Sequence, residues 1–266
     1  AVDLIRSLAD NSHSGQVTVV GHSNGGLLAK VVLDELERLG ETELVDNLVF
    51  LGTPHLGTPQ AIGSVLHGFS QQNLWGVVTD DAVAREIIVD LPGVYPLLPS
   101  PAYFQESDTP PVTFRESGFF SFLRGSDLTD PFIDAYDETI DTHRELIDFM
   151  TGAEGRDAPV FDDMGNPEIA NEAHMAAATA LHTSQLADWQ APEGIEVFNV
   201  VGVGQPTIES FTYRSFGCAR NARTFLGQAI PSCSLTGKRL KPFPVFTLAG
   251  DETVVQRSAE AVEGTH

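Results

Sequence analysis

One short segment near the start of the chain, residues 17–26, constrains its fold more than any other. It reads Val-Thr-Val-Val-Gly-His-Ser-Asn-Gly-Gly, an apolar β-type run followed by Gly-x-Ser-x-Gly and then by a helical apolar pattern. A nucleophile elbow requires this context of strand, sharp turn and helix. The segment therefore predicts an α/β fold in which the hydroxyl of Ser23 stands clear of the edge of the sheet.

The glycines of the motif, Gly21 and Gly25, have a steric explanation. The elbow is expected to hold Ser23 at a positive φ, and the strand and helix cross so closely that side chains at Gly21 and Gly25 would collide. The backbone N–H of Asn24, at the helix N-terminus, is expected to point to the place where an oxyanion would form. A chance glycine-rich turn is the alternative, but the flanking patterns favour the elbow.

The segments around the motif follow the order of a parallel βαβ unit. Helical spacing runs through residues 1–11, a β-type run covers 16–21, a helix is expected at 24–39, and 44–51 end in an apolar strand. The second helix is expected to end at Gly40. Its expected apolar face consists of Leu27, Leu28, Val31, Val32, Leu36 and Leu39. The order strand, helix, strand implies a right-handed crossover.

Residues 58–194 differ in character from the segments on either side. A proline-rich stretch at 91–111 is expected to form a long ordered loop, and 131–150 and 167–189 are expected to form helices. No internal repeat and no low-complexity linker separates this stretch from the rest. We interpret it as a large helical cap inserted over the sheet.

The sheet is predicted to resume at 196–203, and a loop or hairpin then carries both cysteines before an apolar run at 244–249. The predicted fold class is therefore α/β, with a partial α/β-hydrolase core and a mostly parallel sheet. The helical cap is inserted between the second and third strands of that sheet. The predicted parts are 1–57 and 195–266 for the core and 58–194 for the cap.

Asp251 is the candidate for the acid that orients a catalytic base. In α/β-hydrolases the chain order is serine, then Asp or Glu, then histidine, and Asp251 follows an apolar strand in a Gly-Asp turn downstream of Ser23. The alternative is a turn aspartate that caps the next helix. Glu252 and Glu209 are weaker substitutes for the same role.

The base is harder to assign. His266 is the one histidine that follows Asp251, and no further strand separates the two. The base is therefore either His266 or a residue beyond the end of this chain, and the second oxyanion donor is expected to precede Ala1. His22 is expected to pack beneath the elbow. Histidines that precede the acid are expected on the surface or in the insertion; these are His55, His67, His143, His174 and His182.

The net charge bears on the class of partner, and the two cysteines bear on the cellular location. The formal net charge is −22 and the chain has three lysines, Lys30, Lys238 and Lys241, so nucleic acid is not expected as a partner. Cys218 and Cys233 are close in sequence. A disulfide between them would favour an extracellular location, whereas two free buried thiols remain the alternative.

The cap carries an apolar cluster with two possible uses: Phe114, Phe119, Phe120, Phe122, Leu123 and Phe132. Such side chains either form a small core or line an acyl-chain site and meet lipid. No metal and no cofactor are predicted. The acidic pairs at 80–81 and 162–163 lack calcium-loop spacing, and no phosphate-binding helix follows Gly202-x-Gly204.

Four segments together resemble the lecithin:cholesterol acyltransferase-like family of lipases and other α/β-hydrolases. They are Val-Gly-His-Ser-Asn-Gly-Gly at 20–26, Phe-Leu-Gly-Thr-Pro-His-Leu-Gly-Thr-Pro at 50–59, Leu-Pro-Gly-Val-Tyr-Pro-Leu-Leu-Pro-Ser-Pro-Ala-Tyr-Phe at 91–104, and Gly-Asp-Glu-Thr-Val at 250–254. The resemblance implies an acyl-enzyme on Ser23, Asp251 as triad acid, a cap between two core strands, and lipid esters as substrates. Truncation at both ends is expected from the missing early and late strands.

The sequence therefore predicts a serine hydrolase of carboxylic esters, acting on lipid or other esters as lipase, esterase or phospholipid acyltransferase. Contact of the cap with a lipid surface is a further expectation. The alternative is a catalytically incomplete fragment, or a non-catalytic protein that binds a hydrophobic ligand.

Overall fold

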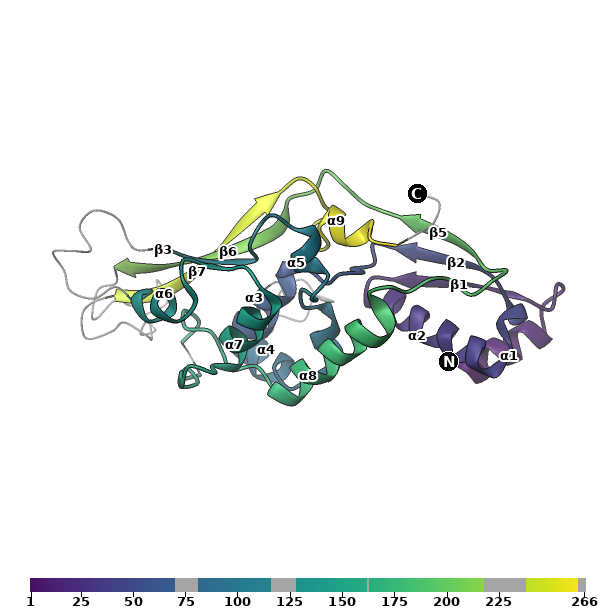
Figure 1. The fold of residues 1–266 in the computed structure, drawn as a ribbon, viewed down its shortest axis with the longest axis horizontal. Coiled ribbons are helices and arrows are strands. Elements are labelled where there is room, and N and C mark those ends of the chain that lie inside the picture. Colours follow the sequence, from purple (N-terminus) through teal and green to yellow (C-terminus); the bar gives the residue numbers. More distant parts are fainter. Residues whose placement is uncertain (70–80, 116–127, 162, 218–237, 263–266) are drawn as a thin grey trace.

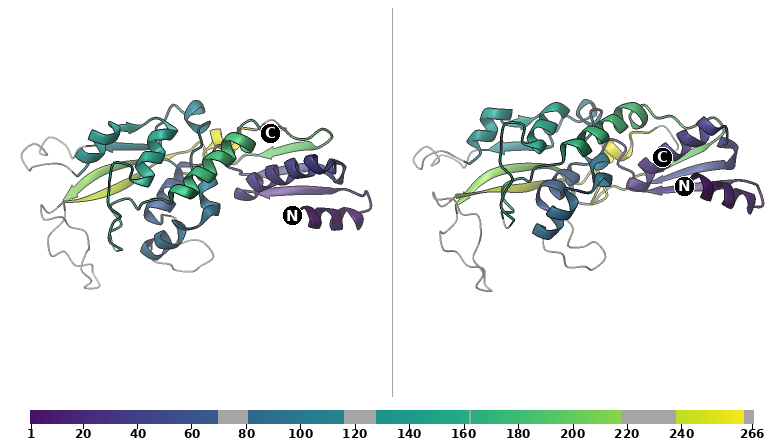
Figure 2. Two further views of the ribbon diagram at one scale, coloured as in Figure 1. Left: turned by 60° about the horizontal axis from the view of Figure 1, so that its bottom comes forward. Right: turned by 90° about the horizontal axis from the view of Figure 1, so that it is seen from below.

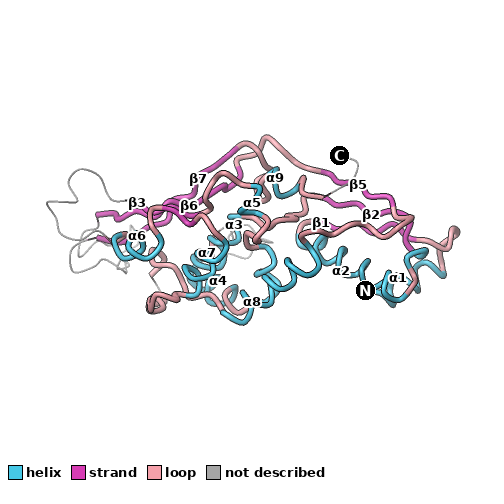
Figure 3. Tube along the Cα trace, in the orientation of Figure 1, coloured by secondary structure: helices cyan, strands magenta, loops and turns pink. Residues whose placement is uncertain are grey.

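The computed structural model describes residues 1–69, 81–115, 128–161, 163–217 and 238–262. These residues form an elongated molecule with one sheet toward each end and helices along one side (Figure 1). Figure 3 shows how much of the chain between the sheets is loop. No helix in the described ranges has both the length and the apolar character needed to cross a membrane.

The first sheet is parallel and contains the predicted βαβ unit. Its strands are β1 (Val17–His22), β2 (Val45–Leu51) and β5 (Glu196–Val200), in the order β1-β2-β5. Both pairs are parallel, as the predicted crossover requires. The expected insertion between the second and third strands is present, because the whole of 58–194 lies between β2 and β5.

Helices α1 (Val2–Asp10) and α2 (Asn24–Leu39) lie along one side of this sheet (Figure 2). Helix α2 has the predicted bounds and ends at Gly40, whose φ of 71° is left-handed. Its buried face differs from the predicted one, because Leu28 is 60% exposed while Lys30 is 1% exposed. The buried positions are Gly26, Leu27, Ala29, Lys30, Leu33 and Leu36.

The cap is more divided than its sequence pattern predicted. Its elements are α3 (Pro59–His67), α4 (Asp81–Ile88), the 3-10 helix η3 (Pro92–Leu97), α5 (Tyr103–Glu106), β3 (Val112–Arg115), α6 (Asp130–Tyr136), β4 (Thr139–Ile140), α7 (His143–Thr151), α8 (Glu172–Leu181) and the π-turn η5 (His182–Leu186). A shorter 3-10 turn, η1 (Thr42–Leu44), precedes β2. The stretch expected as a loop at 91–111 thus contains two short helices.

Local backbone chemistry explains the differences from the predicted helices. The single helix expected at 131–150 is two helices, because Asp137 has φ 58° and ends α6, and a capping box of Thr142 and Glu145 starts α7. The helix expected at 167–189 begins only at Glu172, where the Asn171 side chain accepts hydrogen bonds from the first turn.

The second sheet contains both parallel and antiparallel pairs, and its strands come from the cap and from the segment that follows β5. Strands β6 (Thr207–Gly217) and β7 (Lys238–Thr247) form an antiparallel hairpin, and the sheet order is β4-β3-β6-β7. β3 runs parallel to β6 and antiparallel to β4. Cys218 and Cys233 lie outside the described residues. β6 and β7 thus share a sheet with two strands of the cap.

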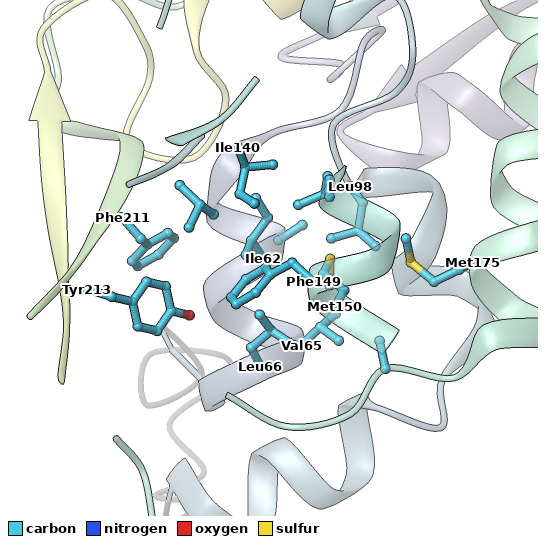
Figure 4. Packing of buried hydrophobic residues seen from close by; sticks show 14 of the residues in the cluster. Ile62, Val65, Leu66, Leu98, Ile140, Phe149, Met150, Met175, Phe211 and Tyr213 are labelled. Atoms are coloured by element: carbon cyan, nitrogen blue, oxygen red, sulfur yellow. The ribbon is translucent and has the colours of Figure 1, made fainter. Parts of the chain in front are cut away.

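The largest buried cluster lies between this sheet and the cap helices (Figure 4). Phe114 stacks on Phe132 with ring centroids 5.3 Å apart, and Phe149 and Tyr213 surround both rings. Phe114 and Phe132 are therefore core residues. The other members of the predicted apolar cluster, Phe119, Phe120, Phe122 and Leu123, lie outside the described residues.

Candidate active site

Ser23 occupies a sharp turn between β1 and α2. Its φ of 53° is positive, as expected for an elbow, and it stands directly before the first residue of the helix. Its backbone N–H donates to the Leu51 carbonyl at 2.9 Å, and its carbonyl accepts from the Gly26 N–H at 2.9 Å. Among the described residues no hydrogen bond engages its hydroxyl, which leaves that oxygen available.

The predicted collision between Gly21 and Gly25 is wrong, because the close approach is to Gly26. A Cβ at Gly21 would lie 2.6 Å from the Gly26 Cα, and one at Gly26 would lie 2.0 Å from Thr53 Oγ1. A Cβ at Gly25 would meet nothing within 4 Å. The strand and helix therefore cross at Gly21 and Gly26, with Thr53 filling the space behind them.

Asn24 begins α2 beside Ser23. As a first-turn residue, its backbone N–H has no intrahelical carbonyl to bond, which suits a donor for an oxyanion. Its side-chain Nδ2 donates to the Gly93 carbonyl at 3.0 Å, although Gly93 lies 69 residues away in the cap. The cap segment η3 is thus joined to the residue next to Ser23.

Asp251 lies beyond the ends of β2 and β5, with its carboxylate held by the backbone. Oδ1 accepts from the N–H groups of Thr253 and Val254 at 3.0 and 2.7 Å. Oδ2 lies 2.8 Å from the position that a Cβ on Gly52 would occupy. Among the described residues no hydrogen bond engages Oδ2. The backbone amides therefore orient Oδ1, and Oδ2 can accept a hydrogen bond from a further donor.

Ser23 and Asp251 meet two consecutive residues at the end of β2. Ser23 N–H donates to Leu51, and Asp251 Oδ2 abuts Gly52, the next residue. Because β2 is the middle strand of the sheet, both residues lie near the carboxyl end of the same central strand.

The two substitute acids are placed differently. The Glu209 carboxylate accepts from the guanidinium of Arg257 in an ion pair. Glu252 is exposed and has φ 87°, and its N–H donates to Thr207 Oγ1 at 2.8 Å. Neither carboxylate is oriented as that of Asp251 is.

None of the described histidines bridges the Ser23 hydroxyl and the Asp251 carboxylate. His266 lies outside the described residues, and His22 is exposed, so the prediction that His22 packs beneath the elbow is wrong. No imidazole nitrogen in the described part of the chain makes a hydrogen bond to Ser23 or Asp251. Within the same part, no three His, Cys, Asp or Glu side chains are grouped closely enough to hold a metal.

Three of the histidines expected on the surface or in the insertion are buried, namely His55, His67 and His182. His55 is 1% exposed and packs edge-on against Phe50 with centroids 4.7 Å apart. Burial and the nearby charge of Lys30 lower its pKa to about 3. His67 is also enclosed, between the Tyr213 hydroxyl and the Met164 carbonyl, and burial lowers its pKa to about 3. The rings of His55 and His67 are therefore neutral at pH 7 and contribute to packing.

Sequence reasoning missed a lysine buried on α2. Lys30 Nζ lies 5.4 Å from the Trp189 ring centroid and 6.0 Å from that of Phe50, and it donates to the Leu186 carbonyl at 3.4 Å. Burial lowers its pKa from 10.5 to about 8. The sequence signal was a single lysine between apolar positions of α2. The hydrogen bond to Leu186 thereby joins the π-turn at the end of α8 to α2.

Comparison with known proteins places this geometry in a family. The family model described as lecithin:cholesterol acyltransferase matches residues 3–263. No curated protein matches the chain. The crystal structure of the Tle4-Tli4 complex is similar at 16% identity with a TM-score of 0.52, over 98% of this chain and 54% of that one.

A second solved structure, the Bacillus licheniformis lipase BlEst2 in propeptide form, matches at 14% identity with a TM-score of 0.28 over 94% of this chain and 58% of that one. The chain spans about half the length of the first of these structures. The likeness to the Tle4-Tli4 structure is one of fold, and it bears out the predicted α/β-hydrolase class. Since the family model covers nearly all of the sequence, the chain belongs to the lecithin:cholesterol acyltransferase family.

Proposed function

We propose that this chain carries the nucleophile and the acid of a serine hydrolase or acyltransferase that acts on lipid esters. Ser23 Oγ attacks the ester carbonyl, and the N–H of Asn24 donates to the oxyanion that forms. The tetrahedral intermediate collapses with loss of the alcohol and leaves an acyl group on Ser23. Water then releases a carboxylic acid, or an alcohol takes the acyl group to form a new ester.

The approach of Ser23 and Asp251 to two adjacent residues at the end of β2, Leu51 and Gly52, is the observation that carries this proposal. A serine hydroxyl is a weak nucleophile until a base removes its proton, and the base must be oriented. An imidazole that contacts both side chains would receive the serine proton on one nitrogen. Its other N–H would donate to the free Oδ2 of Asp251, whose charge stabilises the imidazolium. The candidates for that base are His266 and a histidine beyond the end of this chain.

The experiment is reaction with a fluorophosphonate, which phosphonylates an activated serine with loss of fluoride. The wild-type chain and the Ser14→Ala variant, which removes an exposed serine near β1, are expected to be labelled at one site. Ser23→Ala is expected to remain unlabelled. A folded wild-type chain that is not labelled, or a Ser23→Ala variant that is, would overturn the proposal. Loss of labelling in His266→Ala assigns the base, and unchanged labelling excludes His266.

Exposed apolar side chains on the cap support lipid as the substrate class. Val83 and Ile87, four residues apart on α4, are 39% and 53% exposed, and Leu91, which follows the end of that helix, is 45% exposed. Leu91 precedes η3, the segment whose Gly93 carbonyl accepts from the Asn24 side chain. Ile87→Asp is expected to weaken sedimentation with phosphatidylcholine vesicles while fluorophosphonate labelling stays unchanged. Equal sedimentation of the variant and the wild type would refute the contact.

A further inference from the structure

Two glycines enclose the Asp251 side chain. Gly52 follows β2 with φ 53°, and a Cβ there would lie 2.8 Å from Asp251 Oδ2. Gly202 follows β5, and a Cβ there would lie 2.7 Å from the Cβ of Asp251 and 3.7 Å from its Cγ. Carbon atoms in ordinary contact are about 3.5–4.0 Å apart, so any side chain at either position would displace the aspartate.

Backbone amides hold the other oxygen of the carboxylate. Oδ1 accepts from the N–H groups of Thr253 and Val254 at 3.0 and 2.7 Å, which fixes the side-chain rotamer. The glycines are themselves held, because the Gly52 N–H donates to the Val200 carbonyl at 3.0 Å across the sheet. The position of Oδ2 is therefore set by the ends of two neighbouring strands and by the turn after Asp251.

We infer that Gly52 and Gly202 are positioning residues for the Asp251 carboxylate, and that their lack of a side chain sets where Oδ2 meets the base. This inference rests on the proposed role of Asp251 as the triad acid. The effect passes through Asp251, since neither glycine has a side chain to reach substrate. A catalytic group that moves by about 1 Å loses on the order of 100-fold in rate, so methyl groups here should be costly.

Gly204 offers a matched control for the substitutions. It lies in the same loop as Gly202 and has φ 86°, and a Cβ there would meet nothing within 4 Å. Alanine at Gly204 and at Gly52 would bear a similar strain from positive φ. Only the alanine at Gly52 would also press on Asp251. A difference between these variants therefore reports the contact with the carboxylate and not the backbone strain.

The first measurement is the rate of fluorophosphonate labelling as a function of pH in Gly52→Ala, Gly202→Ala and Gly204→Ala. The first two are expected to react 10- to 100-fold more slowly, at about the estimate for a 1 Å displacement. The acidic limb of their profiles is expected to move to lower pH, because an imidazolium without its carboxylate loses its proton more readily. Gly204→Ala is expected to react within about twofold of the wild type, with an unshifted profile.

The second measurement is hydrogen exchange at the Thr253 and Val254 amides, which does not depend on activity. Both amides are expected to lose protection in Gly52→Ala and Gly202→Ala and to keep it in Gly204→Ala. A wild-type chain that does not react overturns the proposed function and leaves this exchange test intact. Gly52→Ala and Gly202→Ala chains that exchange like Gly204→Ala, or that react at its rate with its pH profile, overturn the inference. The methyl group of Gly52→Ala would contact only Oδ2, at the end of the Asp251 side chain, whereas that of Gly202→Ala would contact Cβ. Gly52→Ala therefore still tests the inference if Gly202→Ala does not fold.

Discussion

Alanine substitutions at the adjacent glycines Gly25 and Gly26 are expected to have opposite effects on stability. Both positions lie in the first turn of α2, so both gain about 0.5–1 kcal/mol from the better helix propensity of alanine. At Gly25 the new methyl group would meet nothing within 4 Å, and Gly25→Ala should stabilise the chain by up to about 1 kcal/mol.

At Gly26 the methyl group would enter occupied space. It would lie 2.0, 2.5 and 2.8 Å from Oγ1, Cγ2 and Cβ of Thr53, which is 0% exposed and has no solvent to move into. Relief requires a shift of more than about 1 Å in a packed region, and overpacking of this kind costs about 1–3 kcal/mol or more. The gain in helix propensity is the same in both variants, so Gly26→Ala is expected to be less stable than Gly25→Ala by the overpacking cost, about 1–3 kcal/mol or more.

Urea unfolding followed by circular dichroism measures this difference, with the m-value checked for equality between variants. Fluorophosphonate labelling of the same samples should be retained in Gly25→Ala and reduced in Gly26→Ala, because the elbow moves with the crossing. The double variant Gly26→Ala/Thr53→Ala should recover part of the loss, since two of the three clashing atoms are removed. Equal stability of the two single variants, or lower stability of Gly25→Ala, would refute the steric argument.

Other expectations concern charge and helix capping. Lys30→Met should stabilise the chain at pH 7 by up to about 3 kcal/mol. Its advantage over the wild type should shrink as the pH rises from 8 to 10.5, because the folded pKa of about 8 lies below the ordinary 10.5 and the buried charge is lost across that range; thermal melts at pH 7 and 10 measure it. Thr142→Ala should cost about 1 kcal/mol in urea unfolding, because it removes the capping box with Glu145. Asp251→Asn keeps the two amide contacts but removes the charge, so fluorophosphonate labelling should slow about 10³- to 10⁴-fold with an unchanged melting temperature.

Local patterns were enough to predict the elbow and the elements beside it. The bounds of α2 agree with the prediction because its start at a serine turn and its end at Gly40 are encoded by neighbouring residues. The cap was predicted less well. Asp137 at positive φ and the capping box at Thr142 divide a continuous helical pattern, and single-residue conformations of this kind are weak signals in composition and spacing.

The buried lysine and the correct pair of crossing glycines required the packed structure. The periodicity of α2 suggested that Leu28 is buried, but the approach of Trp189 and Leu186 from the end of the cap encloses Lys30 instead. The Gly-x-Ser-x-Gly pattern suggested a contact between its two glycines. Which atoms meet depends on the angle at which the strand and the helix cross, and that angle is set by packing.

The sequence alone established the kind of turn that holds Ser23, because a strand, a strained serine and a helix follow one another in a few residues. The arrangement around Asp251 was decided by the tertiary structure. Gly52 and Gly202 are far from Asp251 along the chain, and they reach it only because β2 and β5 pair in parallel and the segment at 250–255 folds back over their ends. A local sequence pattern does not specify the distance between such segments, because that distance is set only when the sheet forms.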